Sequence, residues 1–246
     1  MKINKFIFGM LALAVLPVSC SKQSGESLDG KVSFSLATDG QVTEATRSNV
    51  ADYTTLPQIG QFTIVIANGN DEEVYNGLLE NYNSSTALKA GNYLVTAVYG
   101  STTDEGFDKP CFKGEKNFSV NGGATTEVEI PVELANSILR VECGDDFKSY
   151  YTDYSFSVKT GGGTTIAFPK GETRAAFVDA YTISVSGTLT NQAGKEQTFS
   201  KEYKALSPKT CYTLKFDVSN VGGSTISVSF DDTVEDVDLI DVDLND

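Results

Sequence analysis

Residues 90–100 read AGNYLVTAVYG, and this stretch decides the fold class. Ala90-Gly91-Asn92 interrupts the preceding chain. After it, apolar side chains occupy one face at every second position, namely Tyr93, Val95, Ala97 and Tyr99. The residues between them (Leu94, Thr96 and Val98) are also largely apolar, which is typical of a strand covered on both faces. The stretch therefore predicts a central strand of a β-sheet.

The same period of two recurs on both sides of this stretch. It predicts further strands at residues 31–38, 61–67, 112–120, 125–132, 137–143, 153–159, 164–168, 174–178, 181–189, 197–204, 211–219 and 224–230. Asn68-Gly69 is the strongest hairpin-turn signal in the chain. One helical turn is expected at residues 145–151, and no stretch sustains a 3.6-residue period. The fold class is predicted to be all-β.

Three segments lack a clear pattern. Residues 39–57 predict a long exposed loop, residues 78–85 are irregular, and residues 101–111 predict a polar loop that ends at Pro110-Cys111. Loops as long as the first are uncommon in compact domains and are often functional.

A weak internal echo suggests two domains. The strand that begins at Tyr93 and the elements after it recur in outline from Tyr181, about 88 residues later. Units of nearly a hundred residues with about seven strands each fit β-sandwiches. We therefore predict an N-terminal β-sandwich over residues 31–133 and a C-terminal one over residues 134–246 that ends in an acidic tail. Independent convergence on the same strand pattern is the alternative to duplication.

The N-terminus has the order of a signal peptide. Lys2 and Lys5 precede an apolar run at residues 6–16, which is too short to span a membrane, and a small residue stands just before Cys20. This resembles a bacterial lipoprotein signal, in which residues 1–19 are removed and Cys20 carries the lipid. Residues 20–30 are then a lipidated, flexible tether. Plain secretion is the alternative.

Composition limits the function classes. Removing residues 1–19 takes away two lysines and changes the net charge from −14 to −16, which disfavours nucleic acid and anionic lipid as partners. Membrane contact should come from the N-terminal lipid. The chain has no histidine, so histidine-dependent hydrolysis and imidazole metal sites are excluded. We predict no cofactor, no metal and no catalytic residue. The absence of tryptophan weakens the case for a common sugar-stacking platform, although tyrosine and phenylalanine remain.

Three cysteines, Cys111, Cys143 and Cys211, remain besides Cys20. Cys143 continues the alternation of Leu139 and Val141 and should point into a core. Three unpaired thiols are the favoured interpretation, and one disulfide is the alternative.

Residues 231–246 hold eight carboxylates and no basic residue. Interleaved apolar residues suggest a last edge strand, on which the charges prevent unwanted strand pairing. Calcium binding is the alternative, but the glycines of a tight calcium loop are missing. Asp232-Thr233-Val234 resembles an O-glycosylation site of exported proteins in Bacteroides-type bacteria, which makes Thr233 a candidate acceptor, although three residues also match by chance.

Other groups are less specific. The carboxylate pairs at residues 104–105 and 145–146 are adjacent in sequence, which does not place them across a substrate. Tyr150, Tyr151 and Tyr154 form the nearest candidate for a sugar-binding aromatic platform, and core packing would explain Tyr154 equally well.

Nearly the whole mature chain resembles a Bacteroidales family of lipoproteins that carry a domain of unknown function and are often described as cell-adhesion proteins, akin to the fimbrillin-like group. The residues that carry the resemblance are Cys20, Val32–Leu36, Thr46-Arg47, Phe62–Ile66, Gly91–Ala97, Phe112–Gly114 and Glu133–Asn136. The resemblance implies two tandem transthyretin-like or Ig-like β-sandwiches. In fimbrillins, a protease cuts after an arginine that follows the first strand, and a strand of the next subunit fills the vacated groove. Arg47 stands at the matching place, with a surface arginine as the alternative.

We therefore expect a non-enzymatic surface lipoprotein, anchored in the outer membrane and exposed on the cell, that acts in adhesion or as a fimbria-like subunit. Its partners would be copies of itself, or a protein or glycan on a host or cell surface. A glycan-binding module of a polysaccharide-uptake system is the alternative, and an enzyme with converging carboxylates is the third hypothesis.

Overall fold

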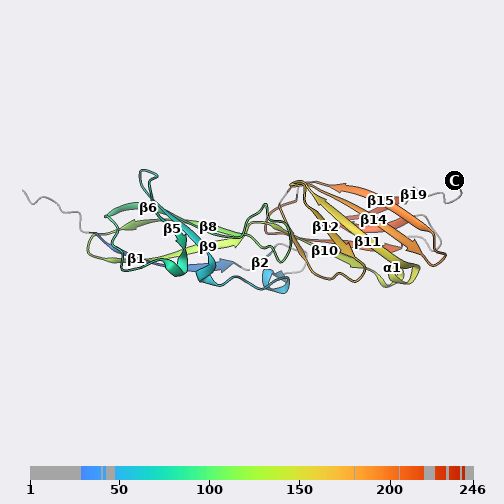
Figure 1. Ribbon diagram of the computed structural model, residues 1–246, viewed down its shortest axis with the longest axis horizontal. Coiled ribbons are helices and arrows are strands. Elements are labelled where there is room, and N and C mark those ends of the chain that lie inside the picture. The colour runs from blue at the N-terminus through green and yellow to red at the C-terminus, as the bar shows by residue number, and fades with distance from the viewer. Residues whose placement is uncertain are drawn as a thin grey trace, which may run out of the picture.

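The computed structural model describes residues 29–39, 41–42, 48–179, 181–204, 206–218, 225–230, 233–238 and 240–241. The described chain is almost entirely β-structure, as predicted, and its sheets lie in two parts along the long axis of the molecule (Figure 1). Within these residues, no helix is both long and apolar enough to cross a bilayer.

The first sheet has six strands, with β6 (Gly91–Tyr99) inside it as predicted. The order is β1 (Lys31–Asp39), β9 (Thr125–Leu134), β8 (Phe112–Val120), β6, β4 (Thr63–Asn68) and β5 (Glu73–Leu78). Strand β6 pairs with β4 on one side and with β8 on the other, and Tyr93, Val95 and Ala97 are buried. The predicted hairpin at Asn68-Gly69 is the turn between β4 and β5.

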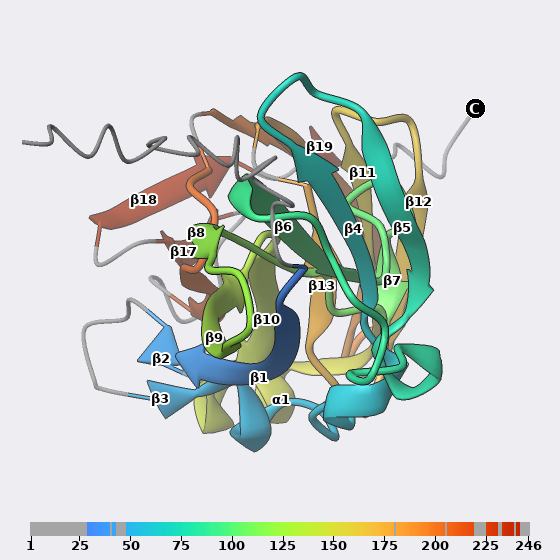
Figure 2. The same ribbon diagram turned by 90° about the vertical axis from the view of Figure 1, so that its left-hand side faces the viewer.

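This sheet folds over itself where β8 meets β9. The two strands pair only between Phe112–Gly114 and Val132–Leu134, while β9 pairs along almost its whole length with β1 in parallel. A Cβ on Gly114 would lie 1.9 Å from the carbonyl oxygen of Pro131, so the close approach requires glycine. Figure 2 shows β1 running across the view, whereas β4 and β5 run steeply.

The folded-over strands enclose an aromatic cluster. The ring of Phe34 on β1 contacts those of Tyr82 and Phe118 edge-on, at 5.0 and 5.6 Å between centroids. Phe118 in turn stacks on Tyr93 of β6. These contacts close a sandwich-like layer around the first hydrophobic core, which includes Ile64 and Ile130.

Two further sheets pack around a second core. One has the order β18 (Thr233–Asp238), β17 (Thr225–Phe230), β16 (Cys211–Val218), β10 (Ser137–Cys143), β13 (Ala176–Val178) and β7 (Gly106–Phe107). The other has the order β12 (Thr165–Pro169), β11 (Tyr151–Thr160), β14 (Ile183–Asn191), β15 (Glu196–Tyr203) and β19 (Ile240–Asp241). Phe156 and Phe216 stack at 4.1 Å in the core between the sheets.

Several sequence predictions need correction. Residues 39–57 are not only an exposed loop, because they include β2 (Gln41–Val42), β3 (Ser48–Asn49) and a 3₁₀ helix at Val50–Asp52 whose Val50 is fully buried. The segment 78–85 contains the 3₁₀ helix Leu79–Asn81, and another 3₁₀ helix spans Ile59–Gln61. The predicted helical turn is present as α1 (Asp145–Tyr150).

The most consequential correction concerns residues 101–111. Within this segment, Gly106–Phe107 forms β7, which pairs with β13 at the end of a sheet otherwise built from residues after 136. The loop therefore joins the N-terminal strands to a C-terminal sheet, across the predicted domain boundary at residues 133–134. The division into two domains stays a prediction.

Candidate functional site

The predicted modification sites lie outside the residues whose side chains the structure describes. Cys20 and Arg47 are outside the described residues, and Thr233 begins β18, of which only the backbone is described. Lipidation, processing and glycosylation therefore stay predictions. Part of the acidic tail forms β18 at the end of its sheet, in agreement with an edge strand.

None of the three internal cysteines forms a disulfide, as the favoured interpretation predicted. Cys111 and Cys211 are buried, Cys211 within the first hydrophobic core, and Cys143 is half-buried. Burial raises the pKa of the Cys143 thiol to about 11, partly offset by a hydrogen bond from the Tyr154 hydroxyl. The thiol is therefore protonated and unreactive near neutral pH.

The three predicted platform tyrosines do not share one exposed face. Tyr151 is buried in the second core, and burial raises its pKa to about 12. The ring of Tyr150 lies edge-on to that of Tyr151. Tyr154 lines a pocket whose described lining includes neither Tyr150 nor Tyr151, so the predicted platform is wrong as a cluster but contains one pocket residue.

The pocket opens between the two C-terminal sheets and has a volume of about 320 Å³. Strand β13 pairs with β10 only from Ser137 to Leu139, so the later residues of β10 have no partner strand on that side among the described elements. The facing strand β12 ends its own sheet. The pocket therefore occupies the open side of the sandwich, where Val141 of β10 and Pro169 of β12 both line it.

The inner wall of the pocket is aromatic. Tyr154, Phe156 and Phe168 line it, and Phe147 of α1 supports the Tyr154 ring edge-on at 5.2 Å. The ammonium of Lys170 lies 5.8 Å from the centroid of the same ring. The ring of Tyr154 is thus fixed by packing before any ligand arrives.

The outer rim of the pocket is polar. Glu142 accepts a hydrogen bond from Arg140 at 2.5 Å, and Glu172 from Arg174 at 2.9 Å. Hydrogen bonds from Arg174 hold the pKa of Glu172 down at about 2. Lys148 adds a positive charge, and Thr173 a hydroxyl. The Glu172 carboxylate is therefore ionised at neutral pH, and the hydrogen bonds from the two arginines orient both carboxylates.

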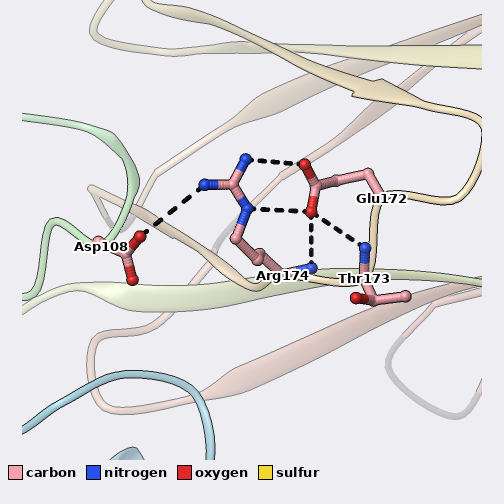
Figure 3. A network of polar contacts seen from close by, with 4 residues as sticks. All are labelled: Asp108, Glu172, Thr173 and Arg174. Carbon is pink, nitrogen blue, oxygen red and sulfur yellow. Dashed lines mark hydrogen bonds and ion pairs between the residues drawn. The ribbon is translucent and has the colours of Figure 1, made fainter.

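Both arginines also lie over aromatic rings from the N-terminal strands and loops. The guanidinium of Arg174 is 4.3 Å from the ring centroid of Phe107, and that of Arg140 is 5.5 Å from the ring centroid of Tyr53. Figure 3 shows Arg174 between Glu172 and Asp108, whose carboxylate lies 3.9 Å away. Such contacts add a cation–π attraction to the ion pairs.

The 101–111 loop fixes this arrangement. Phe107 packs edge-on against Phe168 of the pocket wall at 5.2 Å. The Glu105 carboxylate accepts hydrogen bonds from the Thr160 hydroxyl and the Asp179 backbone N–H. The pocket is thus attached to the N-terminal part of the molecule through two aromatic–arginine contacts and the pairing of β7 with β13.

Sequence reasoning missed most of this pocket. Glu142, Lys148, Glu172 and Thr173 were not singled out, because no motif links them and the fold alone brings them together. A weak signal was present in the alternation of Arg140 with Glu142 and of Glu172 with Arg174, which places opposite charges two residues apart.

The arrangement has the features of a small-ligand site. Among the described residues, no three side chains gather to hold a metal ion. The pocket has the size and the mixture of apolar wall and few polar groups that small-ligand sites have.

The fold and pocket define an all-β protein with a ligand-sized site. The chain belongs to the family described as Domain of unknown function (DUF4493), whose model matches residues 29–245. No curated protein matches the chain in sequence.

Solved structures of Bacteroides proteins resemble the chain distantly. A protein of Bacteroides eggerthii described as "a putative cell adhesion protein" is 13% identical, with a TM-score of 0.46 over 86% of this chain and 96% of that one. A similarly described protein of Bacteroides uniformis is 16% identical, with a TM-score of 0.46 over 72% and 92%. A DUF1812 protein of Bacteroides thetaiotaomicron, one of a group described as "putative polysaccharide binding proteins", is 13% identical. Its TM-score is 0.44 over 84% of this chain and 98% of that one. At this level of similarity, the roles of these proteins do not pass to this chain.

Proposed function

We propose that this protein is a non-enzymatic lipoprotein of the outer membrane that is exposed on the cell surface and acts in adhesion. The observation that carries the proposal is the position of the pocket. It lies in the C-terminal sheets, whereas β1, the strand closest in sequence to the predicted lipid on Cys20, lies in the other part of the molecule (Figure 1). A lipid-anchored protein of this shape would hold its pocket away from the membrane.

Anchoring and exposure are tested together in cells. The full chain and a Cys20→Ala variant are expressed in a Bacteroides host, labelled with an alkyne fatty acid and probed with antibody on intact cells. We expect lipid label and surface staining for the natural chain, and loss of label for the variant. Equal label in both chains, or staining only after lysis, would overturn the proposal.

Self-association is a second candidate function. Strand β1 ends its sheet and pairs only with β9 among the described strands, and Arg47 follows it in sequence. Loss of β1 would remove the buried Val32 and also Phe34, and would uncover the part of the first core that they cover, including the rings of Tyr82 and Phe118. Such a groove could accept a strand of another copy.

Limited trypsin digestion of the protein that begins at Ser21 tests this second function. Cleavage after Arg47 followed by an SDS-resistant ladder on an unboiled gel would support strand exchange. A monomer, cut or uncut, would remove polymerisation and leave adhesion through the pocket.

A further inference from the structure

We propose that the pocket between β10, β11 and β12 binds one neutral pyranose unit of a glycan. This inference rests on the proposed adhesive function and names its ligand class. The pocket volume of about 320 Å³ lies at the lower end of small-ligand sites, which suits a single sugar ring rather than a long chain.

The aromatic wall suits the apolar face of a sugar. A pyranose ring presents C–H groups on its faces and hydroxyls on its edge. Among the aromatic side chains that line the pocket, Tyr154 is half-buried and offers an apolar ring face, whereas Phe156 and Phe168 are buried. The sugar face would pack on this wall and leave its hydroxyls toward the rim.

The rim offers the matching hydrogen-bond groups. A carboxylate has about four acceptor positions, and the contacts of Glu142 with Arg140 leave some of them available. One oxygen of Glu172 accepts hydrogen bonds from the backbone N–H groups of Thr173 and Arg174, and both oxygens accept from the Arg174 side chain. Glu172 therefore keeps fewer acceptor positions for a ligand than Glu142, but these contacts hold them in place. Lys148 supplies donors.

The charges at the rim favour a neutral ligand. Each carboxylate faces an arginine at hydrogen-bond distance, and Lys148 adds one positive charge at an exposed position. The pocket therefore has no large excess of either sign. An anionic sugar would in addition approach a chain with a net charge of −14, which repels it.

The site is organised before the ligand binds. The segment after β12 turns at Gly171, whose φ of 86° favours glycine, and Glu172 then caps its own turn. Arg174 lies on Phe107, so the turn is held from outside the pocket as well. A rigid site loses little conformational entropy on binding, and this increases affinity.

Saturation-transfer difference NMR with the folded chain from residue 29 tests the proposal. The probes are glucose, galactose, mannose, fucose and N-acetylglucosamine, with glucuronate as the anionic comparison. We expect transfer to the C–H protons of at least one neutral sugar and none to glucuronate. Absence of transfer to every neutral sugar, or transfer to glucuronate alone, would overturn the proposal.

Three variants locate the binding. Tyr154→Ala should weaken the affinity about tenfold or more, a loss that corresponds to one strong contact. Tyr154→Phe keeps the ring, so its affinity should stay within about threefold of that of the natural chain. This conservative variant shows whether the ring itself, and not a folding defect of the alanine variant, accounts for the loss. Tyr181→Ala removes a tyrosine that is 65% exposed outside the pocket and should change nothing. Equal binding by the natural chain and Tyr154→Ala would place the sugar elsewhere and refute the assignment.

Failure here is distinguishable from failure of the proposed function. Lipid labelling and surface staining do not depend on sugar binding. A surface-exposed, lipid-labelled protein that binds none of the sugars would keep the adhesive proposal and end the pyranose assignment.

Discussion

At Gly187, the packing of the second core leaves no room for a side chain. A Cβ there would lie 2.2 Å from Cε1 of Phe199 and 3.0 Å from Cδ1 of Phe156. We expect Gly187→Ala to lower the free energy of unfolding by about 1–3 kcal/mol, because both rings must shift in a packed core. Urea unfolding measures the change.

Gly91→Ala is the matched control for this substitution. Gly91 also lies in a strand, but a Cβ there meets nothing within 4 Å. Its effect should stay within about 0.5 kcal/mol. If both variants unfold at the same urea concentration, the tight packing around Gly187 is not what the structure describes.

The ion pair of Glu172 and Arg174 should be visible in the acid range. The pKa of Glu172 is about 2, below the usual 4.5. The carboxylate therefore stabilises the folded state above pH 4.5, and this contribution is lost as the pH falls from 4.5 toward 2. Arg174→Gln should raise the pKa toward 4.5 and make stability less dependent on pH over this window.

An NMR titration of the Glu172 carboxyl carbon checks this expectation. Lys204→Gln is the control, since it also removes one positive charge but from an exposed pair with Glu202. The control should leave the pKa of Glu172 unchanged. A pKa near 4.5 in the natural chain would contradict the pairing shown in Figure 3.

At the scale of elements, strand β7 connects the two parts of the molecule although it has only two residues. Phe107→Ala removes the ring beneath Arg174 and against Phe168. We expect a loss of about 1–2 kcal/mol in the free energy of unfolding, less than for a fully buried phenylalanine. Amide exchange of Ala176–Val178 should become faster, because β13 pairs with β7.

Hydrogen-exchange mass spectrometry measures this effect. Leu56→Ala is the control, because Leu56 is exposed and lies outside β7 and the pocket. It should leave the exchange of Ala176–Val178 unchanged. Unaltered exchange in Phe107→Ala would show that β7 does not support β13.

The sequence predicted long strands better than short ones for a physical reason. A nine-residue strand such as β6 contains several repeats of the period-two pattern, whereas the two residues Gly106–Phe107 are too few to show one. Strand β5 was missed because it lies at a sheet edge and carries mostly polar or half-buried residues. The pocket was missed because its residues come from β10, α1, β11, β12 and the segment after β12, and only the fold brings them together.

At the scale of the molecule, the two hydrophobic cores do not follow the predicted boundary. Four buried residues from beyond residue 134 belong to the first core rather than the second, namely Ile138, Ala175, Phe177 and Cys211. The echo at 88 residues suggested two β-sandwich domains but gave no information on contacts between them. Contacts between distant segments leave no periodic signal in the sequence.

These shared contacts predict how the molecule unfolds. The chain of residues 29–246 should unfold in one calorimetric transition, because Ile138 and Phe177 couple the two cores. A fragment of residues 134–246 lacks β7 and the N-terminal strands, so it should expose these side chains, bind the dye ANS and unfold at a lower temperature than the longer chain. Two well-separated transitions in the longer chain, with no dye binding by the fragment, would instead mean that the two parts are independent domains. In that case the 101–111 loop would form a contact between two independently folded domains, and the pocket would keep its shape without the loop.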